Sequence, residues 1–74
     1  MEKLDLHCTR HHLVRSELIR FVEKHWGQDV DVEIITGNSP RMKDIVKEVL
    51  DEYKLEYREG DFQGVNMGFF KTEI

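Results

Sequence analysis

The chain has 74 residues, of which 39% are hydrophobic and 35% are charged, and its net charge is −4. This length provides for one hydrophobic core, so residues 1–74 are expected to form a single domain, and the composition excludes a disordered tail. The lone cysteine excludes an internal disulfide, and no apolar run approaches the roughly 18 residues that cross a bilayer, so we expect a cytoplasmic protein without a membrane partner.

The negative charge is concentrated in residues 48–61, which hold six acidic and two basic side chains. The remaining residues carry nine charges of each sign. A local phosphate-binding patch is therefore compatible with the overall charge, although strong binding to nucleic acid through charge alone is not expected. The acidic segment is itself a candidate surface for a protein partner.

The first half of the chain predicts a strand followed by a helix. Residues 3–7 (KLDLH) alternate between polar and apolar side chains, which is typical of a half-buried strand with Asp5 and His7 on its polar side. Apolar side chains then recur every three or four positions, which predicts an amphipathic helix over 10–26 with Thr9 as its N-cap. The residues of this apolar stripe are Val14, Leu18, Phe21, Val22 and Trp26.

The second half predicts a strand, a helix and two further strands. Residues 30–36 (VDVEIIT) are rich in β-branched side chains and predict a strand. A helix is expected over about 40–53, with Ser39 as its N-cap and a proline at its first position. Strands are expected at 55–59 and at the terminal FFKTEI (69–74), separated by a glycine-rich loop.

The order β-α-β-α-β-β predicts an α/β fold, a two-layer sandwich with a four-stranded mixed sheet and two helices. The first two strands are joined through a helix and are expected to be parallel. Two helices cover one face of the sheet, so the face with Asp5 and His7 is expected to be open. Alternation along the last strand predicts one face with Phe70, Thr72 and Ile74 and the other with Phe69, Lys71 and Glu73.

The candidate site lies where the first two strands end. Parallel strands bring their carboxyl ends to one edge of the sheet, which places His7 near Thr36 and Gly37. The helices that follow both strands begin at this edge, and helix N-termini offer unpaired N–H groups to phosphate. The basic side chains expected there are Arg10, Arg41 and Lys43. The sequence therefore predicts a phosphate-binding site beside an imidazole.

These residues resemble the motifs of the small MutS-related (Smr) domain family. LDLH (4–7) resembles the family's LDxH motif, TGNS (36–39) resembles its later HGxG or TGxG motif, and the terminal GFFKTEI resembles its last strand. Family members are described as endonucleases that nick DNA or RNA, often as the C-terminal domain of a larger protein, whereas here the domain is expected to stand alone. Two departures, Cys8 and Ser39 in place of glycines, favour the alternative of a binding module that has lost catalysis.

The resemblance and the spacing together predict roles for individual residues. His7 is the predicted general acid/base, which takes a proton from a ribose 2′-hydroxyl or from water. Asp5 is predicted to orient the imidazole or to help hold a divalent cation, the one cofactor that these roles leave open. The residues predicted to contact phosphate are Thr36, Gly37, Asn38, Ser39, Arg10, Arg41 and Lys43. The structural alternative is a strand-end histidine beside a plain turn that Ser39 caps.

A zinc site formed by His7, Cys8, His11 and His12 is a further interpretation of the same segment. Adjacent residues of a strand point apart, and adjacent residues of a helix lie about 100° apart. Four convergent ligands are therefore not expected, and no metal site is predicted. Three functions stay open at this point: an endonuclease acting on RNA or DNA, an inactive nucleic-acid-binding module, and a protein-interaction adaptor that uses residues 48–61.

Overall fold

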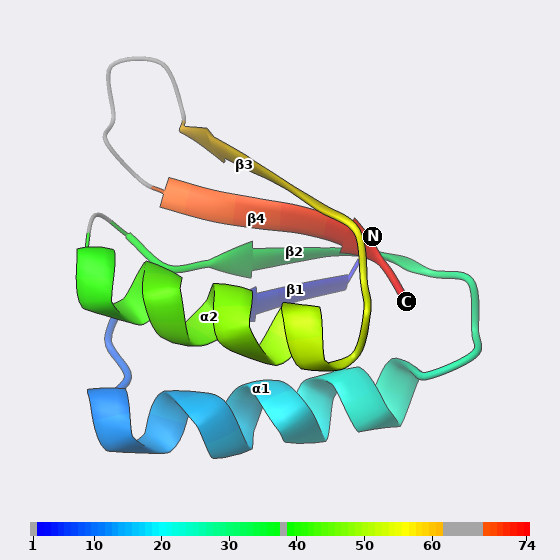
Figure 1. The fold of residues 1–74 in the computed structure, drawn as a ribbon, viewed down its shortest axis with the longest axis horizontal. Coiled ribbons are helices and arrows are strands. Elements are labelled where there is room, and N and C mark those ends of the chain that lie inside the picture. Colours follow the sequence, from blue (N-terminus) through cyan, green and yellow to red (C-terminus); the bar gives the residue numbers. More distant parts are fainter. Residues whose placement is uncertain (1, 38, 62–67) are drawn as a thin grey trace.

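Four strands form a mixed sheet, and two helices pack against one of its faces (Figure 1). The computed structural model describes residues 2–37, 39–61 and 68–74. The elements are β1 (Glu2–Asp5), α1 (His11–His25), β2 (Asp31–Ile35), α2 (Pro40–Glu52), β3 (Tyr57–Asp61) and β4 (Gly68–Glu73). The predicted element order and α/β class are confirmed. Within the described residues, neither helix is long and apolar enough to cross a membrane.

The strands lie in the order β1-β2-β4-β3. β1 and β2 are parallel, as the helical connection predicts, and β4 runs antiparallel to both β2 and β3. The register aligns side chains in rows across the sheet. One row, called the charged row below, consists of Lys3, Glu33, Lys71 and Arg58. The adjacent row, called the Phe69 row, consists of Asp5, Ile35, Phe69 and Gly60.

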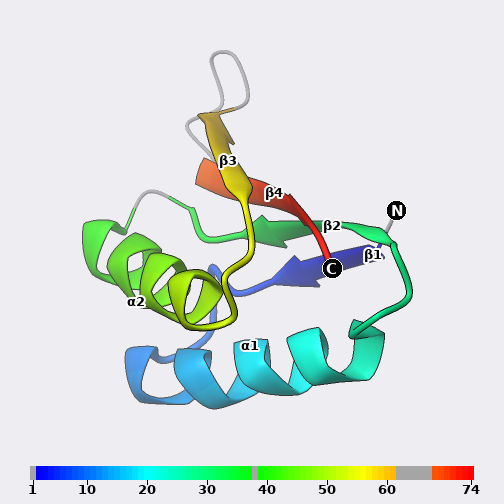
Figure 2. The same ribbon diagram turned by 45° about the vertical axis from the view of Figure 1, so that its right-hand side comes forward.

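The hydrophobic core lies between the helices and one face of the sheet, and Figure 2 shows both helices on the same side. Both helices turn their apolar stripes inward, because hydrophobic residues at helical spacing are removed from water there. The fully buried side chains include Val14, Leu18 and Val22 of α1, Val46, Val49 and Leu50 of α2, and Val32, Ile34 and Phe70 of the sheet. The opposite face carries the charged row and the Phe69 row, and neither helix of the described residues lies over it.

The alternation predicted for the last strand is confirmed. Phe70, Thr72 and Ile74 are buried on the helix-covered face, whereas Phe69 is half-buried and Lys71 and Glu73 are exposed. Phe69 and Phe70 are adjacent in the chain and thus lie on opposite faces, because successive side chains of a strand point in opposite directions.

Several boundaries differ from the prediction. Thr9 is not the N-cap of α1: its N–H donates to the Leu6 carbonyl at 2.9 Å in a tight turn, and Arg10 caps the helix without a side-chain hydrogen bond. Trp26 does not join the core, because α1 ends at His25 and Gly27 follows with a φ of 79°. The indole of Trp26 is exposed on one side and packs against Tyr53, with ring centroids 5.5 Å apart.

The boundaries of the last two strands also differ from the prediction. β3 begins at Tyr57 and extends through Gly60 to Asp61, and β4 begins at Gly68. The expected strand at 55–59 is therefore shifted toward the C-terminus. Residues 62–67 of the expected loop lie outside the described residues.

Candidate functional site

Asp5 and His7 form a hydrogen-bonded pair where β1 ends. The Asp5 carboxylate oxygen Oδ1 accepts a hydrogen bond from the backbone N–H of His7 at 3.1 Å and also contacts Nδ1 of the His7 ring. A single oxygen therefore fixes both the backbone and the ring of His7. The turn that brings the ring back to Asp5 begins directly after the last residue of the strand.

The pairing determines which nitrogen of His7 is left to react. The hydrogen bond from His7 lowers the pKa of the Asp5 carboxyl, more strongly than the small desolvation of that group raises it. Asp5 is therefore ionised at neutral pH and accepts hydrogen bonds only, so Nδ1 carries the proton in the neutral ring. Nε2 is then the acceptor, and the side chain of His7 is 43% exposed. This arrangement is suited to proton transfer at Nε2.

His7 and Gly37 lie together at the same edge of the sheet, as predicted. Gly37 has a φ of 69°, in the left-handed region that favours glycine. A β-carbon added to Gly37 would lie 3.3 Å from Cβ of His7. Gly37 therefore serves the site in two ways: it permits the bend after β2 and it leaves space for the histidine.

The backbone N–H groups of the bend after β2 already have an acceptor. The carbonyl of Gly68 in β4 accepts from the Thr36 N–H at 2.9 Å and from the Gly37 N–H at 3.1 Å. The Thr36 hydroxyl lies 3.2 Å from the same oxygen, and the residue is 1% exposed. In this arrangement Thr36 and Gly37 hold the edge of the sheet together and do not turn donors toward a phosphate.

The two helix starts at this edge differ. α2 is capped by Ser39, as predicted, because the Ser39 hydroxyl accepts from the Met42 N–H at 3.2 Å. The same hydroxyl lies 3.3 Å from Nε2 of His11, so Ser39 also links the first residue of α1 to the start of α2. α1 has no side-chain cap and no acidic residue in its first turn. The Leu13 N–H donates to the Arg10 carbonyl at 2.9 Å, so an anion at this end would meet the N–H groups that precede it and the positive dipole end of the helix.

The predicted phosphate-binding cations are not equivalent. The ammonium of Lys43 is 3.2 Å from the carboxylate of Glu59, and its side chain is only 19% exposed. Arg10 and Arg41 are exposed and form no ion pair with any residue the structure describes. Asn38, also predicted to contact phosphate, lies outside the described residues. The available positive charge at this edge thus comes from Arg10, Arg41 and the start of α1.

The acidic segment 48–61 is partly neutralised by ion pairs to the rest of the fold. Arg15 of α1 approaches Glu52 at 2.6 Å and Glu48 at 3.6 Å. Glu59 is shared between Lys43 and Lys47 of α2. Burial alone would raise the pKa of Glu59, but the hydrogen bonds from the two lysines outweigh it, so this pKa is lowered.

Asp5, His7 and Cys8 are also candidate metal ligands at this edge. Across residues 2–37, 39–61 and 68–74 there is no group of three or more His, Cys, Asp and Glu side chains that could hold a metal ion. Cys8 is exposed and forms no disulfide. The carboxylate of Asp5 is hydrogen-bonded to His7, so a divalent cation would have to be held largely by the substrate and by water.

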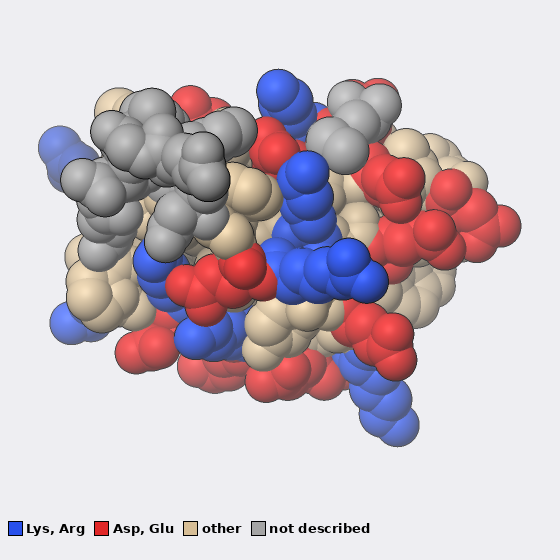
Figure 3. Space-filling view, turned by 90° about the horizontal axis from the view of Figure 1, so that it is seen from above, with Lys and Arg blue, Asp and Glu red and all other residues tan. Residues whose placement is uncertain are grey.

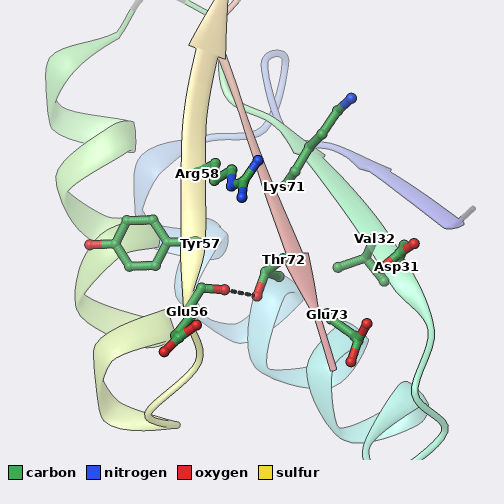
Figure 4. A pocket seen from close by; sticks show the side chains of 8 residues that line it. All are labelled: Asp31, Val32, Glu56, Tyr57, Arg58, Lys71, Thr72 and Glu73. Atoms are coloured by element: carbon green, nitrogen blue, oxygen red, sulfur yellow. Dashed lines mark hydrogen bonds between the residues drawn. The ribbon is translucent and has the colours of Figure 1, made fainter.

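A groove lies at the opposite end of the sheet from His7, on the open face (Figure 4). Arg58 and Lys71 stand beside each other on β3 and β4. Acidic side chains line the rest of this groove: Asp31, Glu56 and Glu73. The groove is therefore mixed in charge and is separate from the Asp5–His7 pair.

Sequence reasoning missed the part that Gly68 takes in this site. Its carbonyl accepts the N–H groups of Thr36 and Gly37, and a β-carbon on Gly68 would lie 2.6 Å from Cε of Lys43. Only the pairing of β2 with β4 brings these residues together, and no local pattern signals that pairing.

Comparison of the chain with protein-family models, with curated proteins and with solved structures finds no match.

Proposed function

We propose that this domain binds RNA or DNA and cleaves the phosphodiester backbone, with His7 as the general acid/base and Asp5 as the residue that orients it. The observation that carries the proposal is the Asp5–His7 pair, in which Nδ1 is held by a carboxylate while an exposed ring leaves Nε2 available. Carboxylate–imidazole pairs of this kind fix the tautomer that hydrolytic enzymes use. The resemblance of LDLH and TGNS to the Smr motifs supports the same assignment.

The proposed reaction on RNA uses the 2′-hydroxyl as nucleophile. Nε2 of His7 takes the hydroxyl proton, the 2′-oxygen bonds to phosphorus, and the bond between phosphorus and the 5′-oxygen breaks. The leaving oxygen takes a proton from the imidazolium or from water. On DNA, water is the nucleophile. Arg10, Arg41 and the uncapped start of α1 offset the charge that develops on the phosphate oxygens.

A nucleic-acid-binding module without catalysis is the second candidate, and one observation favours it. The N–H groups of Thr36 and Gly37 donate to Gly68, and Lys43 pairs with Glu59. Fewer groups are then free to stabilise a transition state than the motif resemblance implies. Such a protein would keep its phosphate contacts through Arg10 and Arg41 and would not turn substrate over.

The test is cleavage of labelled single- and double-stranded RNA and DNA, with and without Mg²⁺, by the wild-type chain and matched variants. His7→Ala is expected to lower the rate by about 10²- to 10⁴-fold, because it removes the acid/base. Asp5→Asn is expected to lower it by about 10- to 100-fold, since it leaves the ring unoriented. Asp44→Asn, at an exposed carboxylate of α2, is the matched control and should not change the rate.

The other outcomes of this experiment distinguish between the candidate functions. Cleavage that persists in His7→Ala contradicts the proposed chemistry. Binding without cleavage in the wild type, weakened by Arg41→Ala, supports the inactive module. Absence of binding to any nucleic acid at low salt, where phosphate contacts are strongest, would leave the protein-interaction adaptor.

A further inference from the structure

We infer that His11 is the general acid of the proposed cleavage, the group that gives a proton to the leaving 5′-oxygen while His7 takes one from the nucleophile. The inference rests on the proposed function and deepens it, because it names the donor of the second proton.

The two proton transfers of this reaction occur on opposite sides of the phosphorus atom. In an in-line displacement the attacking and leaving oxygens lie roughly in line, with phosphorus between them. An imidazole that takes the proton of the 2′-hydroxyl therefore faces away from the 5′-oxygen. A second proton donor on the other side of the phosphate avoids the expulsion of an alkoxide, and histidine is the side chain suited to this near neutral pH.

His7 and His11 border the same bend from two different elements. His7 follows β1, and a β-carbon added to Gly37 would lie 3.3 Å from Cβ of His7. His11 is the first residue of α1, and Nε2 of its ring is 3.3 Å from the hydroxyl of Ser39. Gly37 and Ser39 are two positions apart in the chain, so their Cα atoms are at most about 7 Å apart. The two imidazoles therefore flank one short segment.

The contact with Ser39 determines which nitrogen of His11 can transfer a proton. The Ser39 hydroxyl oxygen accepts from the Met42 N–H at 3.2 Å, and its second lone pair can accept from Nε2–H of His11. In the imidazolium both ring nitrogens carry protons. Nε2–H then stays on Ser39, and Nδ1–H is the proton that can be given away. Within the described residues no hydrogen bond engages Nδ1 of His11, and the side chain is exposed.

The first position of α1 turns the ring of His11 toward the edge where the phosphate is proposed to bind. Side chains of a helix are tilted toward its N-terminus, so a ring at the first position lies over that end. Neither α1 nor α2 has an acidic residue in its first turn. No carboxylate of these two turns therefore competes with the substrate for the protonated ring.

The proposed step on RNA balances in protons and electrons. Nε2 of His7 takes the proton of the 2′-hydroxyl as the 2′-oxygen bonds to phosphorus. The bond between phosphorus and the 5′-oxygen breaks, its electron pair stays on that oxygen, and the oxygen takes the proton from Nδ1 of His11. The products are a 2′,3′-cyclic phosphate and a free 5′-hydroxyl. His7 ends protonated and His11 neutral, and exchange of one proton each with water restores both.

The open face of the sheet is a poorer place for the phosphate, because its charges are mixed. Figure 3, which views the molecule from the side opposite α1, shows acidic and basic side chains intermingled. At the edge with both histidines, by contrast, Arg10 and Arg41 form no ion pair with any residue that the structure describes. This charge favours phosphate binding at the edge that His11 borders. On the open face, Arg58 and Lys71 share their groove with three carboxylates: Asp31, Glu56 and Glu73.

The test compares an ordinary RNA linkage with one whose leaving 5′-oxygen is replaced by sulfur. A thiolate leaves without a proton, because thiols are far more acidic than alcohols, so a missing general acid matters only for the oxygen linkage. His11→Ala should slow cleavage of the oxygen linkage by about 10²- to 10⁴-fold and cleavage of the sulfur linkage by less than about 3-fold. His7→Ala should slow both, because the nucleophile is the same in both.

Two further variants separate proton transfer from hydrogen bonding. His11→Gln keeps a donor for Ser39 but has no proton to transfer, so it should be as slow as His11→Ala on the oxygen linkage. His12→Ala is the matched control: it removes an exposed imidazole about 100° away around the same helix and should leave both rates unchanged. Circular dichroism checks that all variants are folded.

Three results would overturn the role of His11: a wild-type rate in His11→Ala, an equal loss on the oxygen and sulfur linkages, or a wild-type rate in His11→Gln on the oxygen linkage. In each case a slow His7→Ala would leave the proposed function intact. A wild type that cleaves neither linkage rejects the proposed function and the acid role together. A normal rate in His7→Ala, beside a His11→Ala that is slow only on the oxygen linkage, rejects the proposed base alone.

Discussion

The two faces of the sheet use the same residue type for different purposes. Phe70, on the helix-covered face, is fully buried and meets the ring of Tyr57 edge-on at 5.5 Å. Phe69, its neighbour in the chain, lies on the open face over Gly60 and beside Lys71. Both residues belong to the same strand, so the layer of helices makes Phe70 a core residue, whereas Phe69 is half-buried on the other face.

The largest effect is expected from truncating the covered phenylalanine. Phe70→Ala should lower the free energy of unfolding by about 3–5 kcal/mol, because it leaves a cavity between α2 and the sheet. Phe69→Ala should cost about 1 kcal/mol, the usual loss at a half-exposed position. Urea unfolding followed by circular dichroism measures both values.

A domain of this size can be too marginal to tolerate the larger loss. Phe70→Leu then provides a measurable variant, with an expected cost of about 1.5 kcal/mol. Equal losses of unfolding free energy in Phe69→Leu and Phe70→Leu would contradict this contrast between the two faces, since they would mean that both rings contribute alike to the core.

The distinction between Phe69 and Phe70 could be predicted from the sequence, and the arrangement around the site only in part. Alternation along a strand and periodicity along a helix are local patterns, so they predicted the element order, the parallel β1–β2 pair and the two faces of β4. His7 beside Gly37 follows from the same topology. The acceptor of the Thr36 and Gly37 N–H groups could not be predicted, because it lies in β4 and is reached through a non-local pairing.

Two other differences arise from contacts that residue preferences do not capture. Thr9 is a good N-cap residue, yet its N–H closes a turn with Leu6 and the helix begins two residues later. Lys43 has the position of a phosphate ligand, yet Glu59 of β3 pairs with it. A charge near a predicted site can be assigned to a ligand only when its partners in the fold are known.

The glycines of the two faces give a second, smaller contrast. A β-carbon on Gly68 would collide with the carbonyl oxygen of Gly37 and lie 2.6 Å from Cε of Lys43. Because one of these groups is backbone, Gly68→Ala should destabilise the fold by about 1–3 kcal/mol and disturb the bend next to His7. The melting temperature and the cleavage rate should both fall.

Gly60→Ala is the matched variant on the open face. The nearest atoms to its β-carbon would be Cζ, Cε2 and Cε1, at the far end of the flexible Phe69 side chain. The cost to stability should therefore stay below about 1 kcal/mol, within the range of surface substitutions. Gly60→Ala that destabilises the domain as much as Gly68→Ala would show that the open face is packed as tightly as the covered one.

The smallest expected effect is on the pKa of two carboxyl groups, Asp5 on the open face and Glu59 on the helix-covered face. Both pKa values are lowered, for different reasons. Asp5 owes its shift chiefly to the hydrogen bond with His7. Glu59 is partly desolvated, which opposes its shift, and the lysines of α2 outweigh that opposition. Both groups bind protons less readily when folded, so their stabilisation is complete above the unfolded pKa and is lost as the pH falls through the lowered folded pKa.

The two shifts should respond to different substitutions in a carbon-detected NMR titration. His7→Ala should raise the pKa of Asp5 toward its ordinary value and leave the pKa of Glu59 unchanged, because it removes the hydrogen-bond partner of Asp5 and neither partner of Glu59. Lys43→Ala should raise the pKa of Glu59 only partly, since Lys47 remains 3.4 Å away. If Asp5 keeps its lowered pKa in His7→Ala, the carboxylate does not hold the imidazole in solution, and the tautomer that leaves Nε2 free for proton transfer has no support.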